Sequence, residues 1–91
     1  MKVSNLYRIK RGNQNQTIGL IVNGSSASIQ ILGSSAKPTA LSEMVDLTDS
    51  ETLSEGSYSF SMLPEYVYFS GTADRVDIVN ASSEDLSTTL E

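Results

Sequence analysis

A chain of 91 residues supports one domain, and a domain of this size buries only slightly more than roughly 60% of the surface of its unfolded chain. The absence of Cys excludes disulfides, and the absence of His removes the commonest general base and metal ligand. The net charge of −5 divides into +4 over residues 1–11 and −9 over the remainder, and so acidic a body disfavours binding to nucleic-acid phosphates.

No membrane or export segment is predicted. No apolar run approaches the roughly 20 residues that cross a bilayer, and the first eight residues lack the apolar stretch of a signal peptide. We therefore expect a cytosolic protein that contacts neither membrane nor nucleic acid.

Residues 5–11 are predicted to form a half-buried first strand, because apolar and basic side chains alternate along them. A polar loop over residues 12–16 should follow. The two faces of the strand consist of Leu6, Arg8 and Lys10 on one side and Tyr7, Ile9 and Arg11 on the other.

Residues 17–22 and 27–32 each place three apolar side chains on one face, which predicts two more strands. Asn23-Gly24-Ser25-Ser26 lies between them, and Asn-Gly tolerates the positive φ angles of a tight turn. We therefore predict a β-hairpin across residues 17–32.

The middle of the chain is less regular. A Gly- and Ser-rich loop over residues 33–40 leads to a short apolar patch at Met44, Val45 and Leu47, which favours a weak fourth strand. The acidic segment from Asp46 to Gly56 is either a series of turns or one short helical turn capped by Asp49 or Ser50.

Two aromatic strands come next. Tyr58, Phe60 and Met62 alternate with serines, and Pro64 then interrupts the pattern. Over residues 66–70, the side chains of Val67 and Phe69 should face opposite to those of Tyr66 and Tyr68.

A turn at residues 71–74 leads to a last strand at residues 75–79, whereas residues 81–91 show no alternation. We therefore predict an all-β domain over residues 1–80, a small antiparallel sandwich or barrel of about seven short strands, and a flexible tail over residues 81–91. The predicted core comprises Ile18, Leu20, Val22, Ile29, Ile31, Phe60, Val67, Phe69, Val76 and Ile78.

No motif predicts catalysis, a cofactor or a metal. Ser34 and Lys37 have the Ser-x-x-Lys spacing of some acyl-transfer enzymes, but they lie in a predicted loop with no helix to align them. The carboxylate pairs Asp46/Asp49 and Asp74/Asp77 have no environment that would separate their pKa values. The acidic loop before Gly56 resembles no EF-hand, so we expect a solvated loop there rather than a calcium site.

Tyr66 and Tyr68 are the candidate interface residues on the second aromatic strand, because outward tyrosines offer large contact area with a polar tip. The alternative is that these tyrosines cover a sheet edge or belong to the core. Arg8, Lys10 and Arg11 are the candidate interface residues of the basic first strand.

Three segments together resemble small β-sandwich structural proteins of tailed-phage virions. They are an alternating strand that ends in Gly-Ser, a Glu-Gly turn into an aromatic strand, and Tyr-Val-x-Phe before a Gly turn. These features occupy residues 27–34, 53–60 and 66–73. Such proteins often carry a Trp before the fourth strand, whereas this chain has Met44-Val45 there.

The resemblance implies a non-catalytic virion component of the capsid-decoration, head or neck type, present in the host cytoplasm before assembly. Its partners would be further copies of itself or another virion structural protein. We expect the basic N-terminal segment to meet an acidic surface of such a partner, because opposite charges favour head-to-tail contact. The alternative function is a carbohydrate- or ligand-binding sandwich that uses Tyr66 and Tyr68 as its platform.

Overall fold

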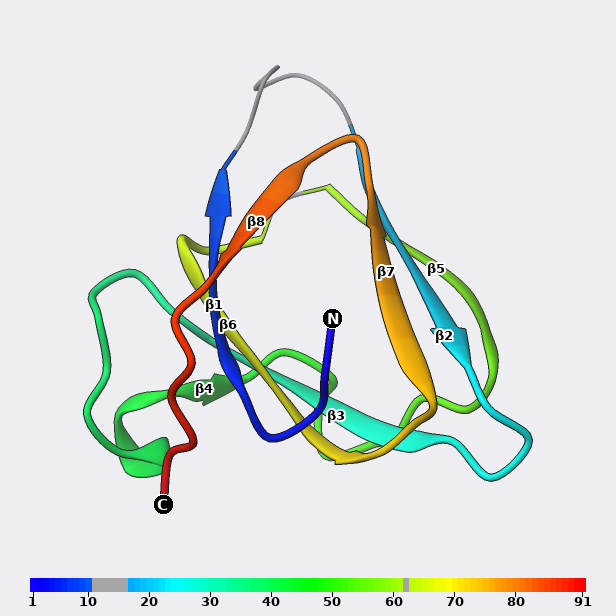
Figure 1. Cartoon of the computed structure of the whole chain (residues 1–91), viewed down its shortest axis with the longest axis horizontal. Helices are drawn as coiled ribbons and strands as arrows, with labels where there is room; N and C mark the ends of the chain where they lie inside the picture. Colours follow the sequence, from blue (N-terminus) through cyan, green and yellow to red (C-terminus); the bar gives the residue numbers. More distant parts are fainter. Residues whose placement is uncertain (11–16, 62) are drawn as a thin grey trace.

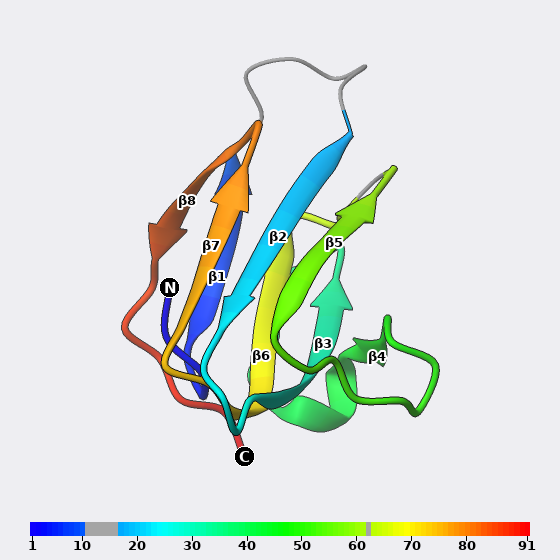
Figure 2. The same ribbon diagram turned by 90° about the vertical axis from the view of Figure 1, so that its right-hand side faces the viewer.

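The computed structural model describes residues 1–10, 17–61 and 63–91, which form two antiparallel sheets packed face to face (Figures 1 and 2). This arrangement confirms the predicted all-β sandwich. The larger sheet has the order β4 (Val45–Asp46), β3 (Ser28–Ser34), β6 (Tyr66–Thr72), β1 (Leu6–Lys10) and β8 (Ser82–Asp85). The smaller sheet has the order β5 (Gly56–Phe60), β2 (Ile18–Asn23) and β7 (Arg75–Val79).

Helical structure in the described residues is limited to one 3₁₀ turn, η1 (Leu41–Glu43). No helix in this part of the chain has the length and apolarity needed to span a membrane.

The core lies between the sheets and is built by alternation along the strands. Eight of the ten predicted core residues are buried, whereas Phe60 and Ile78 are only partly buried because they lie on the edge strands β5 and β7. Tyr7 and Ile9 of β1 complete the inner face, and the ring of Tyr7 lies 6.2 Å from that of Phe69.

The predicted hairpin over residues 17–32 is wrong. β2 pairs with β5 and β7, whereas β3 pairs with β4 and β6, so the two strands lie in different sheets. Gly24 does adopt a positive φ of 132°, but the turn carries the chain across the core. Alternation identifies the buried face of a strand but not its partner. Two successive strands show the same alternation whether they pair in a hairpin or lie in opposite sheets.

A second crossing lies beside the first. The connection from β6 to β7 also passes between sheets, and the Asp74 N–H donates to the Asn23 carbonyl over 2.8 Å. Gly71, at φ 122°, brings β6 so close to β3 that a Cβ at this position would lie 2.2 Å from the Ser28 carbonyl oxygen. Glycine is therefore required at this contact.

The segment after β3 combines a predicted strand with turns. Within the apolar patch at Met44, Val45 and Leu47, residues 45 and 46 form the short strand β4, as predicted. The carboxylate of Asp46 accepts hydrogen bonds from the backbone N–H groups of Thr48 at 2.8 Å and Ser50 at 2.9 Å. These bonds stabilise the turn. Residues 47–55 form no helix, so the alternative of a helical turn capped by Asp49 or Ser50 is wrong.

The expected loose tail from residue 81 onward is also wrong. Ser82–Asp85 form β8 and pair with β1 along its length. Beyond β8, Leu90 is 6% exposed, and the Leu41 N–H donates to the Glu91 carbonyl over 2.9 Å. The buried Leu90 and this backbone hydrogen bond anchor a segment that lacks alternation.

Three predictions fall outside the described residues. They are the polar loop over residues 12–16, the place of Arg11 on the face of Tyr7 and Ile9, and the place of Met62 on the face of Tyr58 and Phe60.

Phe69 and Phe60 are buried to different degrees, so truncating each to Ala should lower the free energy of unfolding by a different amount. Phe69→Ala should lower the free energy of unfolding by about 3–5 kcal/mol, because its ring is fully buried. Phe60→Ala should cost less than about 3 kcal/mol, because part of its ring already contacts solvent. Urea denaturation of both variants measures the difference, and equal costs would contradict the placement of β5 at an edge.

Leu90→Ala tests the docking of the C-terminal segment. Loss of a buried leucine side chain should lower the free energy of unfolding by about 2 kcal/mol or more. Val45→Ala is the control, since Val45 is 65% exposed and its truncation should change stability by no more than about 0.5 kcal/mol. A Leu90 variant as stable as the Val45 variant would mean that the segment is undocked.

Candidate functional site

β1 presents its basic side chains on the outer face of the five-stranded sheet. Leu6, Arg8 and Lys10 point outward while Tyr7 and Ile9 point into the core, as the alternation predicts. Because β1 lies between β6 and β8, it is an interior strand. Its charges therefore do not protect a sheet edge.

Arg8 has acidic neighbours within its own molecule. Its guanidinium lies 3.4 Å from the carboxylate of Glu65, and both side chains are nearly half exposed. The strand register places Tyr66 opposite Arg8 on one side and Glu84 opposite it on the other. The positive charge of Arg8 is thus partly compensated. The sequence did not predict this, because Glu65 and Glu84 are far from Arg8 along the chain.

Lys10 is the less compensated charge of β1. It is exposed, its cross-strand neighbour is Ser82, and it forms no ion pair with any residue that the structure describes. Arg11, the third basic candidate, lies outside the described residues.

The two candidate tyrosines have different environments. Tyr66 and Tyr68 both project from the outer face of β6, as predicted, but Tyr68 is only 3% exposed. It belongs to a second apolar cluster with Leu6 and Leu90. A two-tyrosine platform is therefore not on the surface. The partly buried members of this cluster are Leu32, Leu41, Met44, Tyr66 and Leu86.

The second cluster divides the outer face into a covered half and an open half. The open half holds Arg8, Lys10 and the rim residue Tyr66, and we call these three residues the basic strip. The leucines after residue 85 were the sequence signal for the covered half, since isolated apolar residues in a polar segment indicate docking.

Asn5 and Asp85 fasten the C-terminal segment to the start of β1. The Asn5 amide donates to the Asp85 carboxylate over 2.6 Å, and its carbonyl oxygen accepts the Thr88 N–H over 3.0 Å. The hydrogen bond from Asn5 lowers the pKa of Asp85, assisted by the Ser87 N–H and the positive charge of Lys2. This network lines an open polar hollow between residues 2–5 and 85–89.

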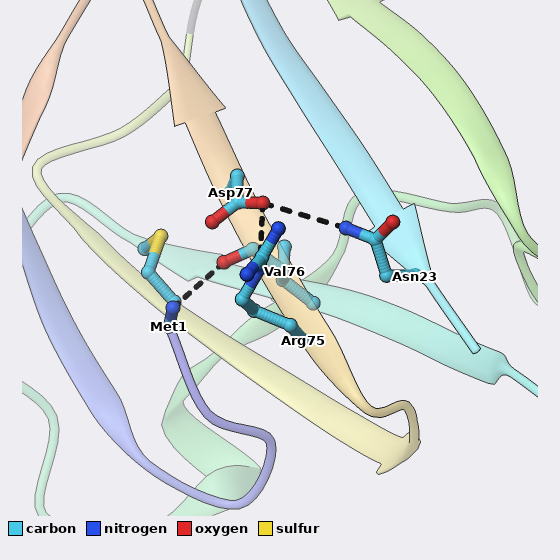
Figure 3. Close-up of polar contacts among 5 residues, drawn as sticks. All are labelled: Met1, Asn23, Arg75, Val76 and Asp77. Carbon is cyan, nitrogen blue, oxygen red and sulfur yellow. Dashed lines mark hydrogen bonds and ion pairs between the residues drawn. The ribbon is translucent and has the colours of Figure 1, made fainter.

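Asp46 and Asp77, one from each carboxylate pair considered from the sequence, are both engaged in hydrogen bonds. Asp77 accepts hydrogen bonds from Arg75 over 2.9 Å and from Asn23 over 3.4 Å (Figure 3). Asp46 is engaged in its own turn, and the hydroxyl and N–H of Thr48 lower its pKa. Among the described residues, no three acidic side chains gather as a metal-binding group.

Ser34 is the last residue of β3 rather than part of the loop expected from the sequence, whereas Lys37 lies in the loop that follows. The Ser34 hydroxyl donates to the Ala36 carbonyl over 2.6 Å, so it stabilises the local turn. An apolar hollow of about 330 Å³ lies next to this loop, lined by Gly33, Ser34, Ser35, Val45, Leu47 and Pro64.

These observations define a small β-sandwich domain with an open, charged strip on one sheet. Comparison of the chain with protein-family models, curated proteins and solved structures found no significant match. The resemblance to phage virion proteins therefore stays a prediction.

The lowered pKa of Asp85 predicts an acid-dependent loss of stability. A carboxyl whose folded-state pKa lies below its unfolded value stabilises the fold above the unfolded pKa, near pH 4, and this contribution is lost as the pH falls through the folded-state pKa. Asp85→Asn should therefore reduce the change in melting temperature between about pH 5 and pH 2.

Glu84→Gln provides the matched control, because it removes the same charge from the neighbouring, exposed position of β8. Thermal unfolding followed by circular dichroism over this pH range gives the comparison. If both variants keep the acid dependence of the unmodified protein, the Asn5–Asp85 contact does not anchor the segment.

Proposed function

We propose that this domain is a non-catalytic structural protein that acts through protein–protein contacts, as a tailed-phage virion component of the capsid-decoration, head or neck type. The observation that carries the assembly role is the basic strip, because Arg8, Lys10 and Tyr66 lie side by side on paired strands. Tyrosine and arginine are enriched at the centres of protein interfaces.

The strip is well suited to a contact of fixed geometry. β1 pairs along both sides, with β6 and with β8, so its side chains are held by a sheet rather than by a loop. Little backbone freedom is lost when such a surface binds, which lowers the entropic cost of association.

Charge indicates the character of the partner surface. Lys10 is exposed, and Arg8 shares its charge with Glu65 through an exposed ion pair that contributes little to folding. An acidic partner surface would be attracted to both of these positively charged side chains. The acidic body of a second copy, or of a neighbouring structural protein, has this character.

The rival sugar-binding function loses its main support. That function requires Tyr66 and Tyr68 together as a platform, and Tyr68 is buried within the second cluster.

Removal of both strip charges tests the assembly role. Arg8→Ser with Lys10→Ser should weaken association with an acidic structural partner at least tenfold at low salt. The unmodified protein should itself bind less tightly as salt rises, because exposed charges are screened over about 8 Å at physiological ionic strength. Light scattering with candidate shell proteins provides the measurement.

Lys37→Ser is the control, because it removes a positive charge from an exposed loop outside the strip. Association that is lost equally in the control and the double variant would assign the effect to net charge alone. Mass spectrometry of purified particles tests the virion role separately, since a structural component is present at a fixed copy number. Absence from particles would overturn that role.

A further inference from the structure

The four sheet edges of the sandwich differ in how they are protected. β4 is only two residues long and ends in the Asp46 turn, and β8 carries Glu84 and Asp85. β7 carries Arg75 and Asp77, and its outer edge is bonded by Met1 (Figure 3). Short length, charge and coverage are the usual means of preventing an edge from pairing with another chain.

β5 has none of these protections. It comprises Gly56-Ser57-Tyr58-Ser59-Phe60, with no charge and no proline, and it lies at the end of the three-stranded sheet (Figure 2). Among the described residues, its backbone pairs with β2 alone. The preceding acid does not guard the edge, because the Glu55 carboxylate accepts the Gly24 N–H over 3.0 Å.

The ladder shows which backbone groups of β5 are free. Val76 exchanges hydrogen bonds with Met1, so its N–H and C=O point away from β2. Because bonded and non-bonded pairs alternate in an antiparallel ladder, Ile21 bonds toward β7, and its neighbours Leu20 and Val22 bond toward β5. Their partners are Tyr58 and Gly56, which leaves the N–H and C=O of Ser57 and Ser59 pointing outward.

We infer that β5 is a self-association edge, at which a second copy of this chain pairs antiparallel with β5 about a two-fold axis at Tyr58. In this register Ser57 of each copy lies opposite Ser59 of the other. Each of these pairs exchanges two backbone hydrogen bonds, and the two small sheets join into one sheet of six strands. A two-fold interface requires such a self-complementary surface.

The side chains of β5 favour this pairing. Tyr58 and Phe60 face inward but remain only partly buried, so a strand laid along the edge removes further aromatic surface from water. Ser57 and Ser59 are small and exposed, and serines opposite each other form favourable cross-strand pairs. Glu55 would lie across from Ser61 of the second copy, so no like charges oppose each other.

The dependence on salt concentration distinguishes the β5 contact from contacts through the basic strip. The β5 inference does not rest on the proposed assembly function. Each copy carries a net charge of −5, so two copies repel each other and screening should tighten the β5 dimer. Contacts through the basic strip should weaken under the same conditions. The measurements can therefore disprove one of the two interfaces and leave the other supported.

Sedimentation equilibrium at protein concentrations up to about 1 mM tests the inference, because one short strand pair gives weak affinity. The unmodified protein should dimerise, more tightly at high salt. Ser59→Pro removes one outward N–H without disturbing the ladder to β2, and it should raise the dissociation constant at least tenfold. Ser59→Ala keeps that N–H and should change the constant by less than about twofold.

If Ser59→Pro fails to fold, as judged by circular dichroism, Ser57→Lys with Ser59→Lys takes its place. It sets like charges across the two-fold axis, and Ser25→Lys with Ser26→Lys in an exposed turn is its control. A monomeric unmodified protein throughout, or folded β5 variants that dimerise as tightly as their controls, would overturn the inference.

Discussion

The position of β6 between β3 and β1 is the constraint on which the rest of the sandwich depends. β6 pairs with β3 over seven positions and aligns β1 on its other side. Its inner face places Val67 and Phe69 in the main core, and its outer face places Tyr68 in the second cluster. One strand thus supplies both apolar clusters, and the covered and open halves of the outer face follow from where it lies.

Local pattern was sufficient to predict the strands and their buried faces, but not their partners. Alternation placed Ile18, Leu20 and Val22 inward because a strand has only two faces. The choice between a hairpin and an arch at Gly24 depends on β7 and β6, which lie some fifty residues further along the chain. The prediction of a flexible tail over residues 81–91 was wrong for a different reason. β8 is stabilised by its pairing with β1 and by the buried Leu90 rather than by alternation in its own sequence.

The candidate site was predicted only in part for the same reason. The outward direction of Arg8, Lys10, Tyr66 and Tyr68 follows from alternation and is confirmed. Whether an outward side chain is exposed depends on what covers the sheet, and Leu41 and Leu90 come from distant segments to bury Tyr68. The partners of Arg8 likewise become visible only once β8 and Glu65 are placed beside it.

The repeated crossing between sheets also bears on how the protein acquires its structure during synthesis. Among the described strands, β3 alone pairs with its immediate successor, β4, so every other ladder joins strands that are further apart in the sequence. Chains dominated by such distant pairings fold slowly for their size. β1 completes its pairing on both sides only when the distant residues 82–85 are present. A growing chain therefore carries β1 without one of its two partner strands until that segment has been made.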